Sequence, residues 1–138
     1  MNAPKRIDTF EIGDYASMET FVSEELINQI ANLSGDRNPV HIDKEYAEKT
    51  IFKGKIAHGL LCLGMISNVL AGKLPGEGTI LLDEKVKYKN PVYIGDKIKC
   101  TLTIMEKDIS KSKLILKAEC VNKNDDNVLL GQIEVKVI

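Results

Sequence analysis

Apolar residues recur at helical spacing in the first part of the chain. Between residues 26 and 31 they lie three and four positions apart, after Ser23 and two glutamates that suit a helix N-terminus. The helix is expected to end near Gly35, because glycine suits a C-terminal cap and Pro39 pushes the preceding residue into an extended conformation. A short helical turn is predicted over Lys44 to Lys49.

A second, long apolar helix is predicted over Gly59 to Ala71, ended by Gly72 and the turn residues Pro75-Gly76. This segment contains no charged residue, so the helix has to be covered nearly all round. One small sheet covers only one side of a helix. We therefore expect a second subunit to supply more cover, which predicts a homodimer.

The remaining segments alternate apolar and polar residues with a period of two, as half-buried strands do. The expected strands are Glu84 to Asn90, Lys97 to Ile104, Leu114 to Cys120 and Leu129 to Val137, with a first strand near Tyr15 to Val22. A polar turn at residues 124–127 separates the last two. This order predicts an α+β fold, with an antiparallel sheet segregated from one long apolar helix.

Length and composition are those of one folded domain. The chain has 138 residues, of which 43% are hydrophobic and 28% charged, values that argue against a disordered or membrane-embedded protein. The apolar helix is shorter than the roughly 20 residues that a membrane span needs. A net charge of -1 gives no global field that would recruit nucleic acid or anionic lipid.

Three cysteines, Cys62, Cys100 and Cys120, are odd in number and lie far apart, without a C-x-x-C pair. They therefore predict a reducing compartment rather than a metal or redox motif. No apolar segment follows the basic residues near the N-terminus, so a signal peptide is not expected and the cytoplasm is the predicted location.

The candidate chemistry lies in residues 34–43, where Asp36 and His41 are predicted on irregular backbone that Gly35 bends and Pro39 stiffens. An acid and a base can converge on such a loop, and together they can deprotonate a shared water. The alternative is structural. Asp36 could accept N–H bonds within a turn, and His41 could be a hydrogen-bonded loop residue.

The second histidine, His58, precedes Gly59 where the apolar helix is predicted to begin. Glycine there would let a ligand approach free backbone N–H groups at the positive end of the helix dipole, which is an arrangement for binding an oxyanion. An ordinary helix start is the alternative, in which His58 only caps or packs.

Together, the segments Ser34 to Asp43 and Gly54 to Gly59 resemble the (R)-specific enoyl-CoA hydratase, or MaoC-like dehydratase, family. The loop of that family reads D-x-N-P-x-H-x-D, its helix opens with A-H-G or a similar motif, and the resemblance covers roughly Phe21 to Asp96. It implies a hot dog fold over a single domain, residues 1–138, and a homodimer. It also implies syn hydration of a trans-2-enoyl-CoA to an (R)-3-hydroxyacyl-CoA, with coenzyme A as part of the substrate and no separate cofactor.

The resemblance assigns roles residue by residue. Asp36 and His41 match the catalytic dyad of the family, and Gly59 matches the residue whose N–H holds the thioester oxygen. Which dyad member removes the water proton stays open. Asn38 fits the motif and could orient the dyad, or it could be an extended residue before proline.

From Gly59, Leu63, Ser67 and Leu70 follow at spacings of four, four and three, so they could line an acyl tunnel on one helical face. Ser67 also occupies the polar position of the family on this helix. Core packing is the alternative for Leu63 and Leu70. Several lysines could meet the phosphates of coenzyme A or simply be solvated; they are Lys53, Lys55, Lys85, Lys87 and Lys89.

Two other functions of the same fold compete. A thioesterase commonly uses a carboxylate on the central helix, and Gly59 to Gly72 contains neither Asp nor Glu. A non-catalytic acyl-CoA-binding module would keep a pocket but would need no dyad. A metal is not expected, because two histidines and an acidic loop do not supply a convincing ligand set.

Overall fold

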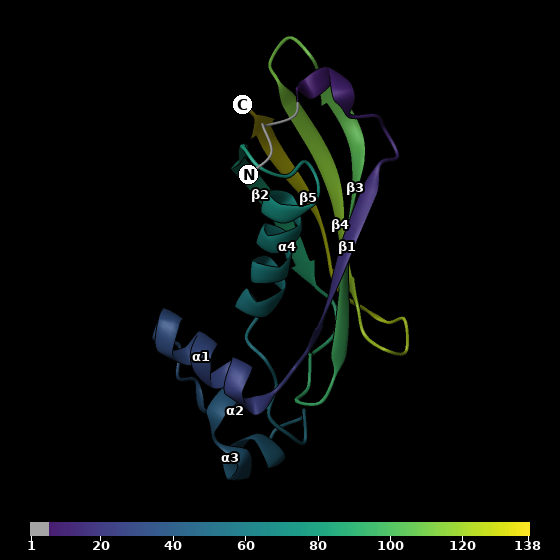
Figure 1. The fold of residues 1–138 in the computed structure, drawn as a ribbon. Helices are drawn as coiled ribbons and strands as arrows, with labels where there is room; N and C mark the ends of the chain where they lie inside the picture. Colours follow the sequence, from purple (N-terminus) through teal and green to yellow (C-terminus); the bar gives the residue numbers. More distant parts are fainter. Residues whose placement is uncertain (1–5) are drawn as a thin grey trace.

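The computed structural model describes residues 6–138 and is built on a five-stranded antiparallel sheet with the strand order β1-β3-β4-β5-β2. The strands are β1 (Tyr15–Phe21), β2 (Thr79–Tyr88), β3 (Lys97–Asp108), β4 (Lys113–Val121) and β5 (Asn127–Val137). Helix α4 (Leu60–Gly72) lies against one face of the sheet (Figure 1). The predicted α+β architecture is confirmed, and the predicted apolar helix shifts by only one residue.

The remaining α-helices gather at one end of the molecule, beyond the first turn of α4 (Figure 1). They are α1 (Glu24–Ser34), α2 (Pro39–Ile42) and α3 (Lys44–Glu48), and a short 3-10 helix, η1 (Ile7–Thr9), precedes β1. The caps of α1 are those expected: the Ser23 hydroxyl accepts the N–H of Leu26, and Gly35 adopts a left-handed φ of 77°.

The prediction of irregular backbone over residues 36–41 is wrong for its second half, where α2 forms one helical turn. Pro39 occupies the first position of this turn, where its fixed φ suits a helix and its missing N–H costs no hydrogen bond. The side-chain oxygen of Asn38 accepts the N–H of Val40 at 3.3 Å and caps the turn. His41 consequently lies on a helical turn whose backbone conformation is fixed by Pro39 and by the Asn38 cap.

Strand β2 begins at Thr79, five residues before the predicted start. The missed residues include Ile80, Leu81 and Leu82, which are consecutive and apolar and therefore give no period-two signal. Each of these three side chains is nearly half exposed, at 45%, 46% and 45%. This apolar stretch lies on an edge strand of the sheet, and the pairing of β2 with β5 shifts register between Leu81 and Asp83.

The register of the sheet forms a row of directly paired residues that crosses all five strands. Its members, in order from β1 to β2, are Met18, Cys100, Cys120, Leu129 and Tyr88. Paired residues point to the same face of a sheet. Cys62 on α4 shares a hydrogen bond with Cys120, so this row lies beneath the central helix. The row brings Tyr88, at the end of β2, beside the start of α4.

Helix α4 is covered by its own sheet more fully than the sequence suggested. The buried side chains of α4 are Leu61, Cys62, Met65, Ile66, Val69 and Leu70. Its exposed face carries small or polar residues such as Gly64, Ser67 and Asn68, and Leu60 is 41% exposed. The exposed face of α4 is therefore less apolar than edge strand β2, where Ile80, Leu81 and Leu82 are each nearly half exposed.

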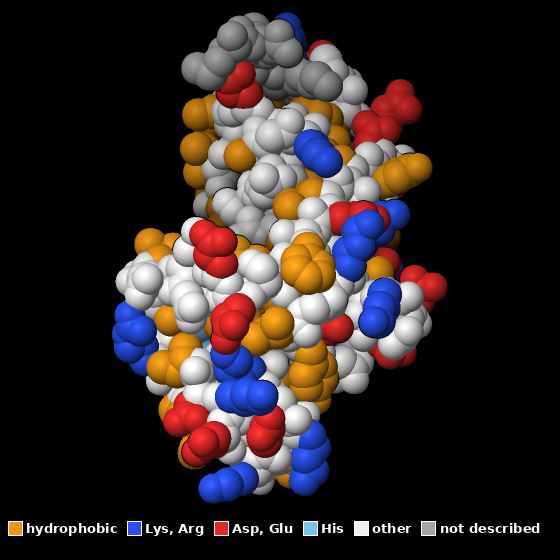
Figure 2. Space-filling model, turned by 60° about the horizontal axis from the view of Figure 1, so that its bottom comes forward, with side chains coloured by type: hydrophobic (Ala, Val, Ile, Leu, Met, Phe, Trp, Pro, Cys, Tyr) orange, Lys and Arg blue, Asp and Glu red, His pale blue; other side chains and the backbone are white. Residues whose placement is uncertain are grey.

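The end of the molecule that carries α1, α2 and α3 faces the viewer in Figure 2. Acidic and basic side chains intermingle there with hydrophobic ones, in keeping with the net charge of -1. Among residues 6–138, no helix is both long enough and apolar enough to cross a membrane.

Candidate active site

A cavity of about 530 Å³ opens beside the start of α4 and contains both histidines. Its walls come from residues 52–59, from the first turn of α4 and from residues 88–92, with Val128 of β5 behind them. Segments distant in sequence thus meet at one place. The sequence predicted that the loop carrying His41 and the start of α4 form one site, but not that Tyr88 of β2 and Val128 of β5 contribute to it.

His41 projects into this cavity from α2 and is 8% exposed. Its Nδ1 lies 2.7 Å from the backbone oxygen of Ile56. A carbonyl oxygen can only accept a hydrogen bond, so Nδ1 carries the hydrogen and Nε2 of the neutral ring is left as an acceptor. The Nε2 atom lies 3.8 Å from Oδ2 of Asp36.

Asp36 lies in the short segment between α1 and α2, and its side chain is half exposed. Its backbone N–H donates to the Ser34 hydroxyl at 3.0 Å, and its Oδ1 accepts the N–H of Asn38 at 3.1 Å. The 3.8 Å separation from His41 is too long for a hydrogen bond. Two acceptors at that distance can each receive one hydrogen of a single water molecule.

The ring of His58 lies directly against that of His41, with the ring centroids 3.9 Å apart and the planes 26° from parallel. Its Nε2 lies 2.9 Å from the backbone oxygen of Asp36 and donates to it. Its Nδ1 is buried and has no hydrogen-bond partner among the described residues. His58 therefore contacts both members of the candidate dyad, which the sequence did not reveal.

Gly59 follows His58 at the entrance to α4, in right-handed backbone with φ -56° and ψ -28°. Within residues 6–138 its N–H donates no hydrogen bond, so this donor at the positive end of the helix is available to a ligand. A Cβ at this position would lie 2.8 Å from Cε1 and 3.0 Å from Cζ of Tyr88. The aromatic ring thus occupies the space that a larger residue would need.

Two other groups in the cavity are held in their neutral forms. A hydrogen bond with Cys120, together with burial, raises the pKa of the Cys62 thiol far above its ordinary value. The Cys100 thiol in turn raises the pKa of Cys120 to about 12. Burial also raises the pKa of the Tyr88 phenol. Cys62 is consequently a thiol and not a thiolate at neutral pH, which argues against a nucleophilic role.

Asp36, His41 and His58 each offer a donor atom within 4.8 Å of the others, which is the one grouping of this kind among the described residues. One nitrogen of each ring is already bound to a backbone oxygen, at Ile56 and at Asp36. The remaining donors can serve proton transfer without an ion.

The other predicted site residues lie elsewhere. Asn38 is exposed and caps α2, Leu63 is partly buried against the core, Ser67 is exposed and Leu70 is 4% exposed. Leu63, Ser67 and Leu70 do not line the cavity, and Cys62 is the α4 residue that does. The structure therefore brings together Asp36, His41 and Gly59, and it separates them from the expected acyl-lining leucines.

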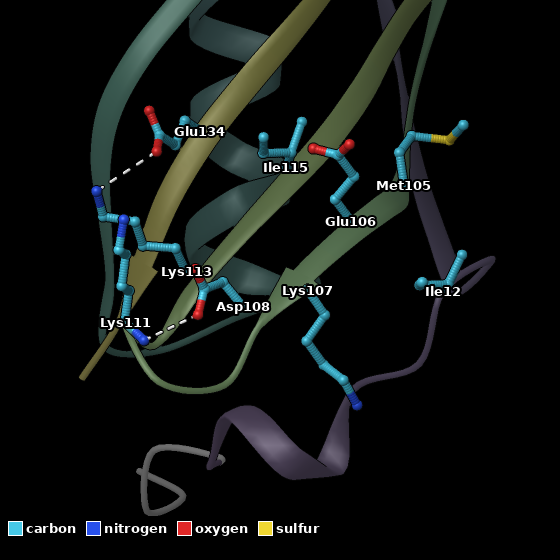
Figure 3. Close-up of a pocket in the computed structure, with 9 residues that line it drawn as sticks. All are labelled: Ile12, Met105, Glu106, Lys107, Asp108, Lys111, Lys113, Ile115 and Glu134. Atoms are coloured by element: carbon cyan, nitrogen blue, oxygen red, sulfur yellow. Dashed lines mark hydrogen bonds and ion pairs between the residues drawn. The ribbon is translucent and has the colours of Figure 1, made fainter.

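Another hollow, of about 490 Å³, lies near the β3–β4 turn on the face of the sheet turned away from α4 (Figure 3). Its charged side chains are exposed or partly exposed, and Lys113 Nζ lies 3.5 Å from Glu134 Oε1. The Lys107 ammonium donates to the backbone oxygen of Phe10 at 2.8 Å. No histidine or cysteine lines this outer hollow, so it is a weaker candidate for chemistry.

Residues 12–125, which include Asp36, His41, His58 and Gly59, match the family described as MaoC like domain. The chain belongs to the MaoC-like family. Residues 36–59 carry the motif resemblance noted in the sequence, so the fold and the local motif lead to the same assignment.

Individual relatives agree with the MaoC-like assignment. An (R)-specific enoyl-CoA hydratase from Rhodospirillum rubrum is 46% identical over 92 residues, which are 67% of this chain and 64% of that relative. A 3-hydroxybutyryl-CoA dehydratase from Methylorubrum extorquens is 32% identical over 94% of this chain and 82% of its own. The solved R-hydratase PhaJ1 from Pseudomonas aeruginosa superposes with a TM-score of 0.92 and 35% identity, over 97% of this chain and 86% of that one. Such hydratases have the hot dog fold, which this chain shares.

Proposed function

We propose that this protein is an (R)-specific enoyl-CoA hydratase, which adds water reversibly to a trans-2-enoyl-CoA and yields an (R)-3-hydroxyacyl-CoA. The observation that carries the proposal is the 3.8 Å approach of the Asp36 carboxylate to Nε2 of His41, beside the free N–H of Gly59. The names of the Rhodospirillum and Methylorubrum relatives support the substrate class, since hydration and dehydration are two directions of one reaction.

The dyad acts on one water molecule. Asp36 Oδ2 and His41 Nε2 each accept one hydrogen of this water, which fixes its oxygen toward the β-carbon of the substrate. As the oxygen attacks the β-carbon, Nε2 takes its proton, and the carboxylate stabilises the imidazolium that forms. The imidazolium then returns the proton to the α-carbon on the same face, which gives syn addition. We assign the transfer of the water proton to His41 because its Nδ1–H bond to Ile56 can remain in place in both the neutral ring and the imidazolium.

Gly59 takes the charge that the attack creates. The electron pair of the carbon–carbon double bond moves toward the thioester oxygen as an enolate, and the N–H at the start of α4 donates to that oxygen. In other enzymes, one such donor contributes about 2.7–4 kcal/mol to transition-state stabilisation. Protonation of the α-carbon restores the thioester and releases the oxygen.

The coenzyme A portion and the acyl group of the substrate contact different parts of the site. Lys89 lies at the exposed edge of the cavity and is available for a phosphate of coenzyme A, whereas Lys55 already pairs with Glu24. Asn38 orients the dyad segment by capping α2. Leu63, Ser67 and Leu70 lie further along α4, outside the cavity, so only an acyl group that extends beyond Cys62 would reach them. Coenzyme A is part of the substrate, and no separate cofactor takes part.

Purified protein mixed with crotonyl-CoA tests the proposal. We expect loss of the conjugated enoyl absorbance, a 3-hydroxybutyryl-CoA product and, by chiral chromatography after hydrolysis, the (R) enantiomer. Release of free coenzyme A without hydration would instead identify a thioesterase. Binding of crotonyl-CoA without either reaction would identify a non-catalytic binding module.

We also propose that the protein is a homodimer in which edge strand β2 of one protomer pairs with β2 of its partner. Unpaired edge strands are prone to associate, and this edge exposes Ile80, Leu81 and Leu82 together. Joining two such edges satisfies their backbone groups and removes the apolar side chains from water. A second copy of this chain is the occupant that matches this edge in length and register.

Light scattering with size-exclusion chromatography tests the dimer. Leu81→Lys should give monomers, because it places a charge in the proposed interface. Leu33→Lys is the matched control, since Leu33 is 85% exposed and lies on α1. A monomeric wild type, or an unchanged dimer in Leu81→Lys, would contradict the proposed interface.

A further inference from the structure

His58 occupies a position that neither a helix cap nor core packing explains. It is 4% exposed, yet its Nδ1 has no hydrogen-bond partner among the described residues. An unpaired polar atom in a protein interior carries a free-energy cost, so an apolar residue of similar shape would pack there more favourably. The contacts of the rest of the ring indicate why an imidazole is present.

The first contact holds the segment that carries Asp36. Among the described residues, the other hydrogen bonds of residues 35–38 reach no further than five positions along the chain. The bond from His58 Nε2 to the Asp36 backbone oxygen spans 22 positions and ties this exposed segment to the start of α4. Without it, only local turns would hold Asp36 near the cavity.

The second contact holds the ring of His41. The bond from Nδ1 to Ile56 fixes the direction of the imidazole in its plane, and the stacked His58 ring covers one of its faces at 3.9 Å. The two constraints are complementary, since one limits rotation and the other limits tilt. A single side chain therefore restrains both partners of the 3.8 Å approach between Asp36 and His41.

We propose that His58 is a positioning residue that sets the separation of Asp36 and His41 through one hydrogen bond and one ring stack. The proposal rests on the proposed function of that pair. His58 itself neither gives nor takes a proton in the reaction, because its Nε2–H is bound to a backbone oxygen and its Nδ1 is buried. A shift of about 1 Å in catalytic geometry can cost about 10²-fold in rate, so such a residue affects turnover strongly.

Two variants separate the contacts. His58→Phe keeps a flat ring against His41 but removes the donor to Asp36, and His58→Gln keeps a donor but removes the ring. With crotonyl-CoA we expect each to lower kcat by about 10–10²-fold while KM stays within about threefold, because misplacement affects the transition state more than binding. Wild-type kcat in both variants would overturn the proposal.

Combination with Asp36→Asn distinguishes positioning from general structural damage. If His58 acts by placing the Asp36 carboxylate, His58→Phe should change kcat by less than about twofold in the Asp36→Asn background, because residues that act as a unit are non-additive. Met65→Ala, at a buried position of α4 outside the cavity, is the matched control and should give additive effects. Additive losses for His58→Phe would overturn the positioning role.

Amide hydrogen exchange provides a readout that does not depend on the reaction. His58→Phe should speed exchange at Asn38, whose N–H is bound to Asp36 Oδ1, relative to wild type and to Met65→Ala. If wild-type protein failed to hydrate crotonyl-CoA, the proposed function would fall while this measurement still tested the tether. Unchanged exchange at Asn38 in His58→Phe would overturn the inference.

Discussion

The two hollows on opposite faces of the sheet have similar volumes, about 530 Å³ beside α4 and about 490 Å³ on the outer face, and both are lined by nitrogen-bearing side chains. They differ in what fixes those side chains. In the outer hollow, Lys113 and Glu134 pair with each other near solvent, where ion pairs contribute little to the stability of the fold. In the cavity beside α4, backbone oxygens of Ile56 and Asp36 fix the two imidazole rings.

The difference shows why charge alone does not identify a reactive site. A side chain that pairs with another flexible side chain keeps many orientations. A ring bound to a carbonyl oxygen has one tautomer and one direction, which proton transfer requires. The cavity also receives the free N–H of Gly59 at a helix start, whereas the outer hollow is formed mainly by strands and their turn.

The largest expected effect is the difference between the two hollows when an acidic or a basic side chain is replaced in each. Asp36→Asn and His41→Gln should each lower kcat for crotonyl-CoA by about 10²–10⁴-fold, because each removes a group that handles the water proton. Glu134→Gln and Lys113→Gln are the matched controls and should leave kcat within about twofold, since exposed substitutions away from the site have small effects. Near-normal turnover by either dyad variant at saturating substrate would contradict the assignment.

A smaller loss is expected from crowding the Gly59 donor. The added methyl group of Gly59→Ala would press on the Tyr88 ring and displace one of them, which should lower kcat by up to about 10²-fold. The double variant Gly59→Ala/Tyr88→Ala should recover part of that loss. Gly72→Ala is the control, since nothing lies within 4 Å of a Cβ there. Full activity in Gly59→Ala would show that this close approach is not needed.

Chain-length preference should change more modestly. If Leu70 ends the acyl tunnel, Leu70→Ala should raise the ratio of kcat/KM for an eight-carbon over a four-carbon enoyl-CoA by an amount equivalent to about 1–3 kcal/mol. Because Leu70 is buried, the variant should also lose about 2–5 kcal/mol of stability, so the ratio is the measurement. A change with Cys62→Ala but none with Leu70→Ala would place the tunnel along the Cys62 side of α4.

No effect is expected from metal removal. Asp36, His41 and His58 lie close enough to suggest a ligand set, but carbonyl oxygens already bind one nitrogen of each ring. Protein treated with a chelator and then desalted should hydrate crotonyl-CoA at its original rate. Activity lost on this treatment and restored by zinc or manganese would contradict the proposed mechanism.

Sequence alone predicted the parts of this structure that depend on local pattern. Period-two alternation predicted β3, β4 and β5, and the capping signals at Ser23 and Gly35 predicted the bounds of α1. The start of β2 was missed because Ile80 to Leu82 are apolar on both faces of an edge strand. Alternation is informative only where one face of a strand is wet.

The candidate site also has features that the sequence predicted and features that it did not. The spacing of Asp36 and His41 and the position of Gly59 can be read along the chain, and the family resemblance added their roles. The contact of Tyr88 with Gly59 depends on the pairing of Tyr88 with Leu129 in β5. The stack of His58 on His41 likewise depends on how α2 lies against the segment that precedes α4. Neither follows from spacing, because both are set by packing between segments distant in sequence.

The strand order also has a consequence for folding kinetics. Strands β3, β4 and β5 follow one another and can pair as hairpins, whereas β1 joins β3 through partners as distant as Tyr15 and Thr103. The segment that carries Asp36, His41 and His58 is bounded by β1 and β2, which occupy opposite edges of the sheet. Closing so long a loop is slow, since its entropy must be lost before its contacts form. During refolding, we therefore expect β-sheet signal to return before the two histidine rings meet.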